Sequence, residues 1–591
     1  MNRLFSQKMS RRKFITGVST ALLGLVIGCR QEQKLSPSPQ APPLQATPAA
    51  PLVPHITLLP PAGDAVPDMI LHNAKVLTVD ARDSIAQAIA IKDSVIQKVG
   101  SDQEVLATAG ENTQRVDVGG RVITPGLIDA HIHLRAVGLN NVYFMPLIPP
   151  EVVDVQSLQK ALAELVKKSA PGEWIQGYYM ALRDKPIPDR YDLDAVSADN
   201  PVFIMQISGH YGVANSAALQ LAGVNASTQS PAGGIIEKDK NGEPTGVFFN
   251  HVAMDILRKA TPPITEEMTR DGILTVQPLM AATGMTSFHD NNIRDLKTIR
   301  IYQELAKNGQ MYLRSTLYYT LEYQQNLQNL AKIDYYEDAL TRFAGYKILI
   351  DGSGLTAFCH EKHNGVAWTK TTWEADIYQQ TIRALHDSGG QISVHCVGDA
   401  AVDLTIDAYE AAMNANPRPD PRHRIEHAVL TTPQATQRIK DLGILIHTNP
   451  QFLYIFGSGF IQIFGEHRAE RIIPTREWLE SGVHLSIGSD APSCPWYAPC
   501  ATLAGAMNRM AYTKQVIGSD QALTFMEALR AHTYEAAYAA HEEHLKGSIE
   551  PGKYADLAVW QQDPEGMTPG ELFNMPPMYM TLVGGKVVHQ A

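Results

Sequence analysis

The sequence predicts an α/β fold in which eight parallel strands and their helices close into a (β/α)8 barrel of the TIM type. Eight short apolar segments are spread along the chain, and helical patterns such as 373–388 and 400–415 separate several of them. This alternation is typical of a parallel sheet. Five of the segments carry metal-binding residue types at or near their ends, where the active sites of such barrels collect.

The barrel strands follow one another along most of the chain. The first segment, Arg121–Asp129, leads into His131 and His133. The other seven are expected at 285–289, 311–318, 346–350, 391–395, 423–427, 444–447 and 484–488. About 150 residues separate His133 from His289, which is far longer than an ordinary connection, so we expect an inserted domain at about 140–280.

Short strand patterns flank the barrel region on both sides. Residues 69–79, 88–91 and 94–99 have strand patterns joined by turns, and 547–560 and 578–588 repeat this pattern near the C-terminus. We expect 68–124 and 547–591 to form the two parts of one small β-sandwich beside a barrel that spans 125–546.

The N-terminus resembles a twin-arginine export signal with a lipobox. Arg11 and Arg12 precede an uncharged run, 14–28, that is shorter than the roughly 20 apolar residues of a membrane-spanning helix. Cys29 follows and would become the lipidated first residue. We therefore expect a signal over 1–29, a disordered linker over 30–67, and a lipoprotein anchored on the periplasmic or extracytoplasmic side. An uncleaved N-terminal anchor is the alternative.

Composition excludes several classes of partner. The chain has 50 Lys and Arg against 61 Asp and Glu without a basic cluster, which gives no footprint for nucleic acid. Five cysteines without a Cys-x-x-Cys pair exclude a disulfide scaffold, and we expect Cys494 and Cys500 to be free thiols rather than a pair. We therefore expect a small-molecule substrate rather than a nucleic acid. Membrane contact is expected only through the lipid anchor, and the sequence leaves open whether the protein forms a homo-oligomer.

The metal-binding residue types predict a two-metal centre. His131 and His133 alternate with Ile132, so both rings point to one face of the strand end. His395 and His427 would supply imidazoles to the second metal, and Asp490 a carboxylate to the first. A single buried histidine is usually structural, but two in this strand order favour metal ligation.

The chain resembles amidohydrolase family 3, a group of metal-dependent hydrolases that includes N-substituted formamide deformylases, from about residue 68 to 588. The motifs that carry this resemblance are 129–133, 208–210 with 215–216, 231–234, 243–246, 352–353, 394–399, 424–427, 488–492 and 547–552. The resemblance implies a binuclear, usually zinc, centre and hydrolysis of a carbon–nitrogen bond other than a peptide bond. Asn250 stands where the family commonly has an acid and Asn449 where it often has Gln, so both are expected to shape the pocket.

Lys347 would complete the centre as a carbamate. An ammonium group cannot bind a cation, whereas a lysine carboxylated by carbon dioxide can bridge two metals; an ordinary salt-bridged lysine is the alternative. A hydroxide held between the metals would attack the carbonyl, and Asp490 would take its proton and deliver it to the departing nitrogen. Lys347 and Asp490 are thus the expected catalytic residues.

Three further residues are expected to face the substrate. His210 and Asn215 lie in the inserted region after a strand-like run at 202–207, where a structural hydrogen-bonding role is the alternative. His289 closes the second strand segment and is the reserve candidate for the base.

Two rival functions stay open at this point. The chain could be a metal-dependent binding lipoprotein that has lost catalysis, or a lactone or phosphoester hydrolase on the same centre. Asp490 argues against the first, because a protein that only holds metal has little need of a proton shuttle.

Overall fold

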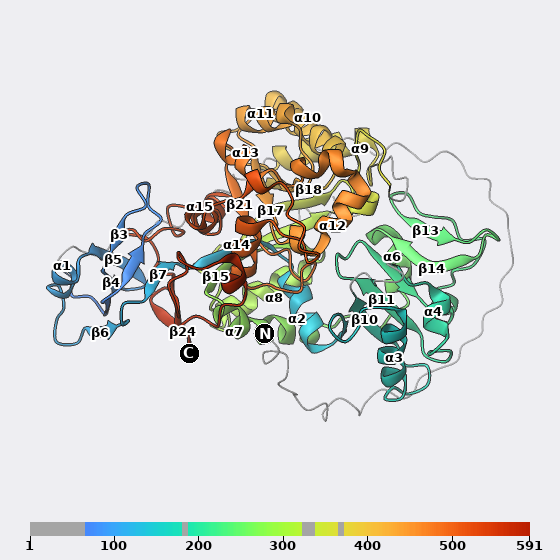
Figure 1. Cartoon of the computed structure of the whole chain (residues 1–591), viewed down its shortest axis with the longest axis horizontal. Coiled ribbons are helices and arrows are strands. Elements are labelled where there is room, and N and C mark those ends of the chain that lie inside the picture. The colour runs from blue at the N-terminus through green and yellow to red at the C-terminus, as the bar shows by residue number, and fades with distance from the viewer. Residues whose placement is uncertain (1–64, 180–181, 183–186, 322–336, 365–370) are drawn as a thin grey trace. The chain divides into compact units, whose positions relative to one another are not determined.

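A computed structural model describes residues 65–179, 182, 187–321, 337–364 and 371–591 (Figure 1). The predicted signal, the lipobox and nearly all of the predicted linker lie outside these residues. Within them, eight strands form one sheet in the order β21-β20-β19-β18-β17-β16-β15-β8, and each hydrogen-bonded neighbour is parallel.

Each of the eight predicted segments contributes a strand to this sheet, which confirms the α/β barrel. The strands are β8 (Leu127–Ile132), β15 (Met285–Ile293), β16 (Arg314–Leu321), β17 (Thr341–Leu349), β18 (Gln391–Cys396), β19 (Arg424–His427), β20 (Leu445–Thr448) and β21 (Leu485–Ile487). The two end strands meet just beyond their carboxyl ends, where the amide of Asp490 donates to the carbonyl of His131 at 2.7 Å. The amide of His133 likewise donates to the carbonyl of Ala491 at 2.8 Å.

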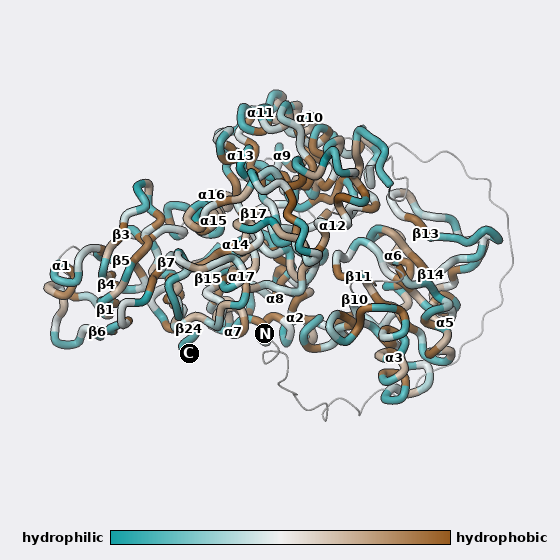
Figure 2. The backbone as a smooth tube through the Cα atoms, viewed as in Figure 1, coloured by the Kyte–Doolittle hydropathy of each residue, from teal (hydrophilic) through white to brown (hydrophobic). Residues whose placement is uncertain are grey.

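Helices follow most of these strands and cover the sheet. They are α7 (Glu266–Ala281), α8 (Leu296–Lys307), α9 (Ala375–Asp387), α10 (Asp399–Ala415), α11 (Pro433–Asp441), α12 (Phe452–Phe464), α13 (Thr475–Glu480), α14 (Pro499–Asn508), α15 (Phe525–Ala531) and α16 (Tyr534–Tyr538), with 3₁₀ turns η2 (Gly354–Thr356), η3 (Glu466–Arg471) and η4 (Ser519–Gln521). Helix α9 buries Tyr378, Ile382 and Leu385 at helical spacing, as an amphipathic helix on a sheet does. Figure 2 shows α12 as hydrophobic along most of its length and α11 as largely hydrophilic.

A second sheet lies between β8 and β15 in the sequence. Its order is β13-β14-β12-β11-β10-β9. Its strands are β9 (Met145–Leu147), β10 (Ile175–Tyr179), β11 (Val202–Gln206), β12 (Tyr211–Ala214), β13 (Ile235–Lys238) and β14 (Pro244–Phe249), and the helices of this region are α2 (Leu134–Val142), α3 (Val155–Val166), α4 (Arg190–Asp194), α5 (Ser216–Leu221) and α6 (His251–Arg258). The sheet has apolar clusters of its own on its strands and helices. The boundaries of an inserted domain stay a prediction.

Strands from both ends of the described chain share a third sheet, in the order β24-β23-β22-β7-β2-β3, and a four-stranded sheet has the order β5-β4-β1-β6. The elements are β1 (Met69–His72), β2 (Lys75–Leu77), β3 (Ile85–Ala86), β4 (Ala88–Lys92), β5 (Val95–Gly100), α1 (Asp102–Leu106), β6 (Gln114–Asp117), β7 (Val122–Pro125), β22 (Leu557–Val559), α17 (Pro569–Phe573), β23 (Met580–Val583) and β24 (Lys586–Gln590).

The first predicted barrel segment was wrong in one respect, because Arg121–Asp129 is not one strand. Strand β7 pairs with β2 and β22, and only β8 belongs to the barrel. The chain divides at Gly126, where a Cβ atom would lie 2.2 Å from the hydroxyl of Thr286. A residue with a side chain does not fit this turn between the two sheets.

Two findings concern anchoring and oxidation in the described part of the chain. No helix there is long and apolar enough to cross a membrane. Cys359, Cys396, Cys494 and Cys500 are free, so the prediction of free thiols at Cys494 and Cys500 is confirmed.

Candidate active site

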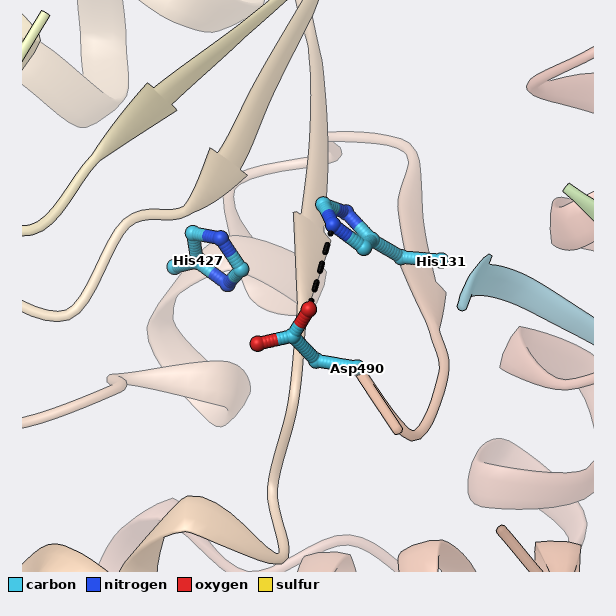
Figure 3. A group of neighbouring side chains, drawn as sticks. All are labelled: His131, His427 and Asp490. Carbon is cyan, nitrogen blue, oxygen red and sulfur yellow. Dashed lines mark ion pairs between the residues drawn. The ribbon is translucent and has the colours of Figure 1, made fainter. Parts of the chain in front are cut away.

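His131, His133 and Asp490 converge where β8 and β21 end. His131 is fully buried, and His133 follows β8 directly as the residue before α2. One carboxylate oxygen of Asp490 lies 2.9 Å from Nε2 of His133 and 3.3 Å from Nε2 of His131. Figure 3 shows the contact of Asp490 with His131. Asp490 reaches this place from a left-handed backbone conformation with φ of 53°.

His427, His395 and Lys347 complete the group from neighbouring strands. The ring of His427 lies 4.9 Å from that of His131 and 4.6 Å from that of His395, between centroids. Nζ of Lys347 lies 3.4 Å from Nε2 of His131. The structure therefore brings all six predicted ligands together at the carboxyl ends of the barrel strands, the position typical of barrel active sites.

The protonation states suit metal binding. Burial lowers the pKa of His427 to about 4 and those of His131 and His395 well below their usual value, so these imidazoles are neutral. Burial raises the pKa of Asp490, but the hydrogen bond with the adjacent His133 and the nearby amine of Lys347 outweigh this and hold the pKa below its usual value. Neutral imidazole and carboxylate are the forms that bind a metal ion.

Contacts within this group fit a cation better than they fit hydrogen bonding. The ligand atoms of His131, His427 and Asp490 all lie within 4.8 Å of one another. Oδ1 of Asp490 is buried without a well-formed hydrogen bond, although two imidazole nitrogens lie close to it, and Nδ1 of His133 has no hydrogen-bond partner either. Buried polar atoms without partners are rare, so the carboxylate oxygen of Asp490 among imidazole nitrogens suits a bound cation.

Lys347 is the exception among these ligands, since it is a cation among groups that would bind one. Its side chain is almost completely buried in β17, and burial lowers the pKa of its amine to about 8. With this pKa about a tenth of the amine is neutral at pH 7, far more than for an ordinary lysine.

Two residues orient the candidate ligands: Glu426, which the sequence analysis missed, and Asn449, which it expected only to shape the pocket. Nδ1 of His131 lies 2.5 Å from Oε2 of Glu426, and Nδ1 of His427 lies 2.7 Å from Oδ1 of Asn449. Each contact leaves the Nε2 atom of the ring directed at the centre, as partners of metal-bound histidines do. Glu426 itself is buried and accepts hydrogen bonds from Nε of Arg424 at 2.7 Å and from Ser393 at 2.8 Å.

Strand geometry explains how Glu426 and His427 serve the same site. Arg424 and Glu426 alternate on β19 and share one face, toward the barrel interior. His427 ends the strand with φ of 69°, which turns its ring out of the alternation. The sequence signal was the alternation of Arg424 with Glu426, a paired charge on one face of a buried strand.

A pocket lies beside the group, on the side of the inserted region. It is about half open, and its space together with the adjoining solvent amounts to about 420 Å³. It is lined by His210, Gly233, Asn250, His251, Val252, Arg294, Leu321, Leu349, Asp351, Thr372 and Trp373. His210 connects the pocket with the centre, because its ring lies 4.8 Å from that of His395. Burial lowers the pKa of His210 to about 3, so it acts as a neutral ring.

Two of the predicted substrate contacts lie elsewhere. Asn215 caps α5: its Oδ1 accepts from the amides of Val202 and Ala218, and its Nδ2 donates to the carbonyls of Ser197 and Asn200. The prediction that Asn215 faces substrate was therefore wrong, and its structural alternative holds. His289 lies in the middle of β15 rather than at its end, with Nδ1 3.1 Å from Nη1 of Arg424.

Comparison with known proteins adds the family. The profile of the amidohydrolase family matches residues 114–589. The chain belongs to the amidohydrolase family. It is 31% identical over 532 residues to the N-substituted formamide deformylase of Arthrobacter pascens, which covers 85% of this chain and 95% of that protein.

Two further relatives extend this result. Protein LONG AFTER FAR-RED 3 of Arabidopsis thaliana is 28% identical over 560 residues, or 90% of this chain and 93% of that protein. The crystal structure of an uncharacterized metal-dependent hydrolase from Pyrococcus horikoshii OT3 superposes with a TM-score of 0.68 at 23% identity, covering 85% of this chain and 99% of that one. The latter match confirms the fold. As an amidohydrolase, the protein is a hydrolase of carbon–nitrogen bonds other than peptide bonds, and candidate metal-binding residues are present.

Proposed function

We propose that the protein hydrolyses a formamide-like amide to an acid and an amine at a centre of two divalent metal ions, zinc in the first instance. One observation carries the proposal: neutral imidazoles, a buried carboxylate and a buried amine converge beyond the strand ends. The ligands would be His131, His133, Lys347, His395, His427 and Asp490. The 31% identity to an N-substituted formamide deformylase supports the substrate class.

Bound ions would supply Lewis acidity that polarises the carbonyl and makes water nucleophilic near neutral pH. Imidazole and carboxylate ligands suit zinc. The neutral amine of Lys347 would form a bond to the carbon of carbon dioxide and release one proton. The resulting carbamate is an anion. It would attract the metal ions, whereas the protonated form of the lysine would repel them.

Asp490 would move the proton. Its pKa lies below the usual value, so it begins as a carboxylate that can accept a proton from the attacking water. It would then deliver this proton to the nitrogen as the carbon–nitrogen bond breaks, because an amine leaves poorly unless it is protonated. The short distances to His131 and His133 hold the carboxylate in place for both steps.

A substrate screen tests this function. Purified protein loaded with zinc would be offered N-formyl amines, N-acyl amino acids, lactones and phosphotriesters. We expect formate and amine in equal amounts from an N-formyl amine, with activity lost on chelation and regained with zinc. Turnover of lactones or phosphotriesters alone would reassign the reaction, and metal binding without any turnover would favour the binding-protein alternative.

We further propose that the protein is exported by the twin-arginine route and anchored through a lipid on Cys29. The support is the pattern of Arg11, Arg12 and Cys29, which lies outside the described residues. The mature protein should be released from membranes by detergent but not by salt, since burial of acyl chains is indifferent to ionic strength. Release by salt, or an unlabelled Cys29 after growth with labelled fatty acid, would contradict the anchor.

A further inference from the structure

The side chain of Asn250 offers the pocket an acceptor that the protein leaves unused. Asn250 is 4% exposed, and its Oδ1 is buried without a hydrogen-bond partner. Its Nδ2 donates to the carbonyl of Gly233 at 3.1 Å. Because a carbonyl cannot donate, this bond fixes which end of the amide is nitrogen, and the oxygen is the end left over.

The backbone of Asn250 is strained. Its φ of 64° and ψ of 156° fall in a region that residues with side chains rarely adopt. The amide of Asn250 donates to the carbonyl of His210 at 2.6 Å, and its carbonyl accepts from Met254 in the first turn of α6 at 3.1 Å. Strain that the surroundings maintain in a pocket points to a role for the side chain held there.

Gly352 connects this acceptor with the proposed metal centre. A Cβ atom on Gly352 would lie 2.0 Å from Oγ1 of Thr356 and 2.7 Å from Oδ1 of Asn250, so only a glycine fits beside these two oxygens. The carbonyl of the same glycine lies 3.1 Å from Nε2 of His395. Gly352 is thus the single residue that lies between the unused oxygen of Asn250 and His395, a candidate metal ligand.

The remaining pocket groups favour a neutral donor with an apolar substituent. Leu321, Leu349 and Trp373 give the pocket an apolar wall. Arg294 adds a positive charge that disfavours an ammonium group. Asp351 is the acid in the lining, but it accepts hydrogen bonds from the amides of Val397 and Gly398, which occupies its carboxylate.

We propose that Oδ1 of Asn250 accepts a hydrogen bond from the N–H of a secondary amide substrate whose apolar N-substituent lies against Leu321, Leu349 and Trp373. The substrate class rests on the proposed function. The inference adds that the enzyme distinguishes secondary amides, which have this N–H, from tertiary amides, which lack it. Asn250 is then a specificity-determining residue.

The test compares N-benzylformamide with N-benzyl-N-methylformamide. A buried acceptor without its donor lowers kcat/KM by about 10- to 100-fold, so the wild type should prefer the secondary amide by at least that factor. Asn250→Gly removes the side chain at a backbone conformation that glycine adopts freely, so the fold should be retained. In this variant kcat/KM for the secondary amide should fall. The remaining preference over the tertiary amide should then reflect only the bulk of the extra methyl group.

Two controls isolate the acceptor. Asn250→Asp keeps an oxygen acceptor but loses the donor to Gly233, so a preference retained in this variant would assign the selectivity to the acceptor. Asn73→Gly makes the same change at another asparagine with positive φ, in the turn between β1 and β2, and should leave the ratio unchanged. An unchanged ratio in Asn250→Gly would overturn the inference.

Binding separates this inference from the proposed function. Calorimetry on the Asp490→Asn holoenzyme, which should bind without rapid turnover, measures the affinity for both amides. Preferential binding of the secondary amide that disappears in Asn250→Gly would support the inference even if the wild type fails to hydrolyse either formamide. Equal binding of both amides in the presence of Asn250 would overturn it, whatever the wild type hydrolyses.

Discussion

At the scale of single residues, two of the four candidate histidine ligands, His131 and His427, are oriented by polar side chains from other parts of the barrel. Glu426 on β19 contacts Nδ1 of His131, and Asn449, after β20, contacts Nδ1 of His427. Arg424 keeps the buried Glu426 charged: although burial raises its pKa, the adjacent guanidinium lowers it to about 2. An ionised Glu426 accepts the Nδ1 proton, so the other nitrogen of His131 can serve as a ligand.

Substitution of Asp490 tests proton transfer. The amide in Asp490→Asn keeps the size of the side chain and an oxygen, but it cannot accept the proton. We expect kcat for a formamide substrate to fall by about 10²-fold or more, while the melting temperature of the holoenzyme stays close to that of the wild type. Turnover near the wild-type rate would show that another residue is the base.

Substitution of Glu426 tests orientation of His131. Glu426→Gln removes the charge that holds Nδ1 of His131, so we expect the metal affinity to fall by about 10- to 100-fold, as for other orienting partners. Competition with a chelator measures this affinity directly. Glu543→Gln, which affects a carboxylate paired with Arg422, is the matched control and should leave metal affinity unchanged. Equal effects of both changes would mean that Glu426 acts only through general stability.

The sequence was sufficient for ligands that stand at strand ends, because alternation and strand order place His131, His133, His395, His427 and Asp490 at one rim. It was not sufficient for their partners. Strands β8 and β19 are not neighbours in the sheet, so only closure of the barrel brings Glu426 to His131. The prediction for Asn215 was wrong for the opposite reason. A polar residue in a shared motif indicated substrate contact, but the oxygen and nitrogen of its amide are both used in capping the local helix and bonding the adjacent backbone.

At the scale of elements, the close contact of α2 and α7 positions His133. Helix α2 begins directly after His133, and Gly138 within it packs on Gly272 of α7. A Cβ atom on Gly138 would lie 2.4 Å from the backbone of Gly272, so neither helix can retain its position if this glycine is replaced.

Replacement of Gly138 should therefore affect both stability and the centre. We expect Gly138→Ala to lower the free energy of unfolding by about 1–3 kcal/mol through overpacking, and to weaken metal binding through displacement of His133. Gly459→Ala is the control, because nothing lies within 4 Å of its Cβ position in α12. Denaturant titration and chelator competition measure the two effects, and normal metal affinity in Gly138→Ala would separate the helix contact from the site.

Element boundaries were less predictable than the elements themselves. The apolar run Arg121–Asp129 was continuous in sequence, yet its two halves belong to different sheets because Gly126 packs against Thr286. Similarly, β15 continues four residues beyond His289 to Ile293, so the residue expected at the rim lies inside the barrel. The periodicity of apolar residues alone does not predict these tertiary contacts.

At the scale of the whole molecule, buried neutral histidines make stability depend on pH. His532 is the clearest case outside the site: it is completely buried, neither ring nitrogen has a hydrogen-bond partner, and burial lowers its pKa to about 4 from 6.5. The folded pKa lies below the unfolded one, so the unfolded chain binds the proton first. The contribution of neutral His532 to the free energy of unfolding is therefore fully present above pH 6.5 and is lost as the pH falls toward 4.

Replacement of His532 should reduce this acid sensitivity. The shift corresponds to as much as ~3 kcal/mol at low pH, so the wild type should lose stability between pH 6.5 and 4 faster than His532→Leu. Urea unfolding of the metal-free proteins at several pH values measures the difference. Parallel pH profiles for the two proteins would mean that His532 does not titrate on unfolding in this range.

The number of metal ions bound per chain tests the central claim most directly. Elemental analysis of the native protein, purified with zinc and without chelators, should give two equivalents for the wild type and fewer for Lys347→Ala, because the alanine cannot form the bridging carbamate. Unbound metal must be removed from the native protein before the analysis. Mass spectrometry alone is a poor test of the carbamate, since carbamates are lost in acid. One equivalent or none in the wild type, or an unchanged two equivalents in Lys347→Ala, would contradict a two-metal centre bridged by Lys347.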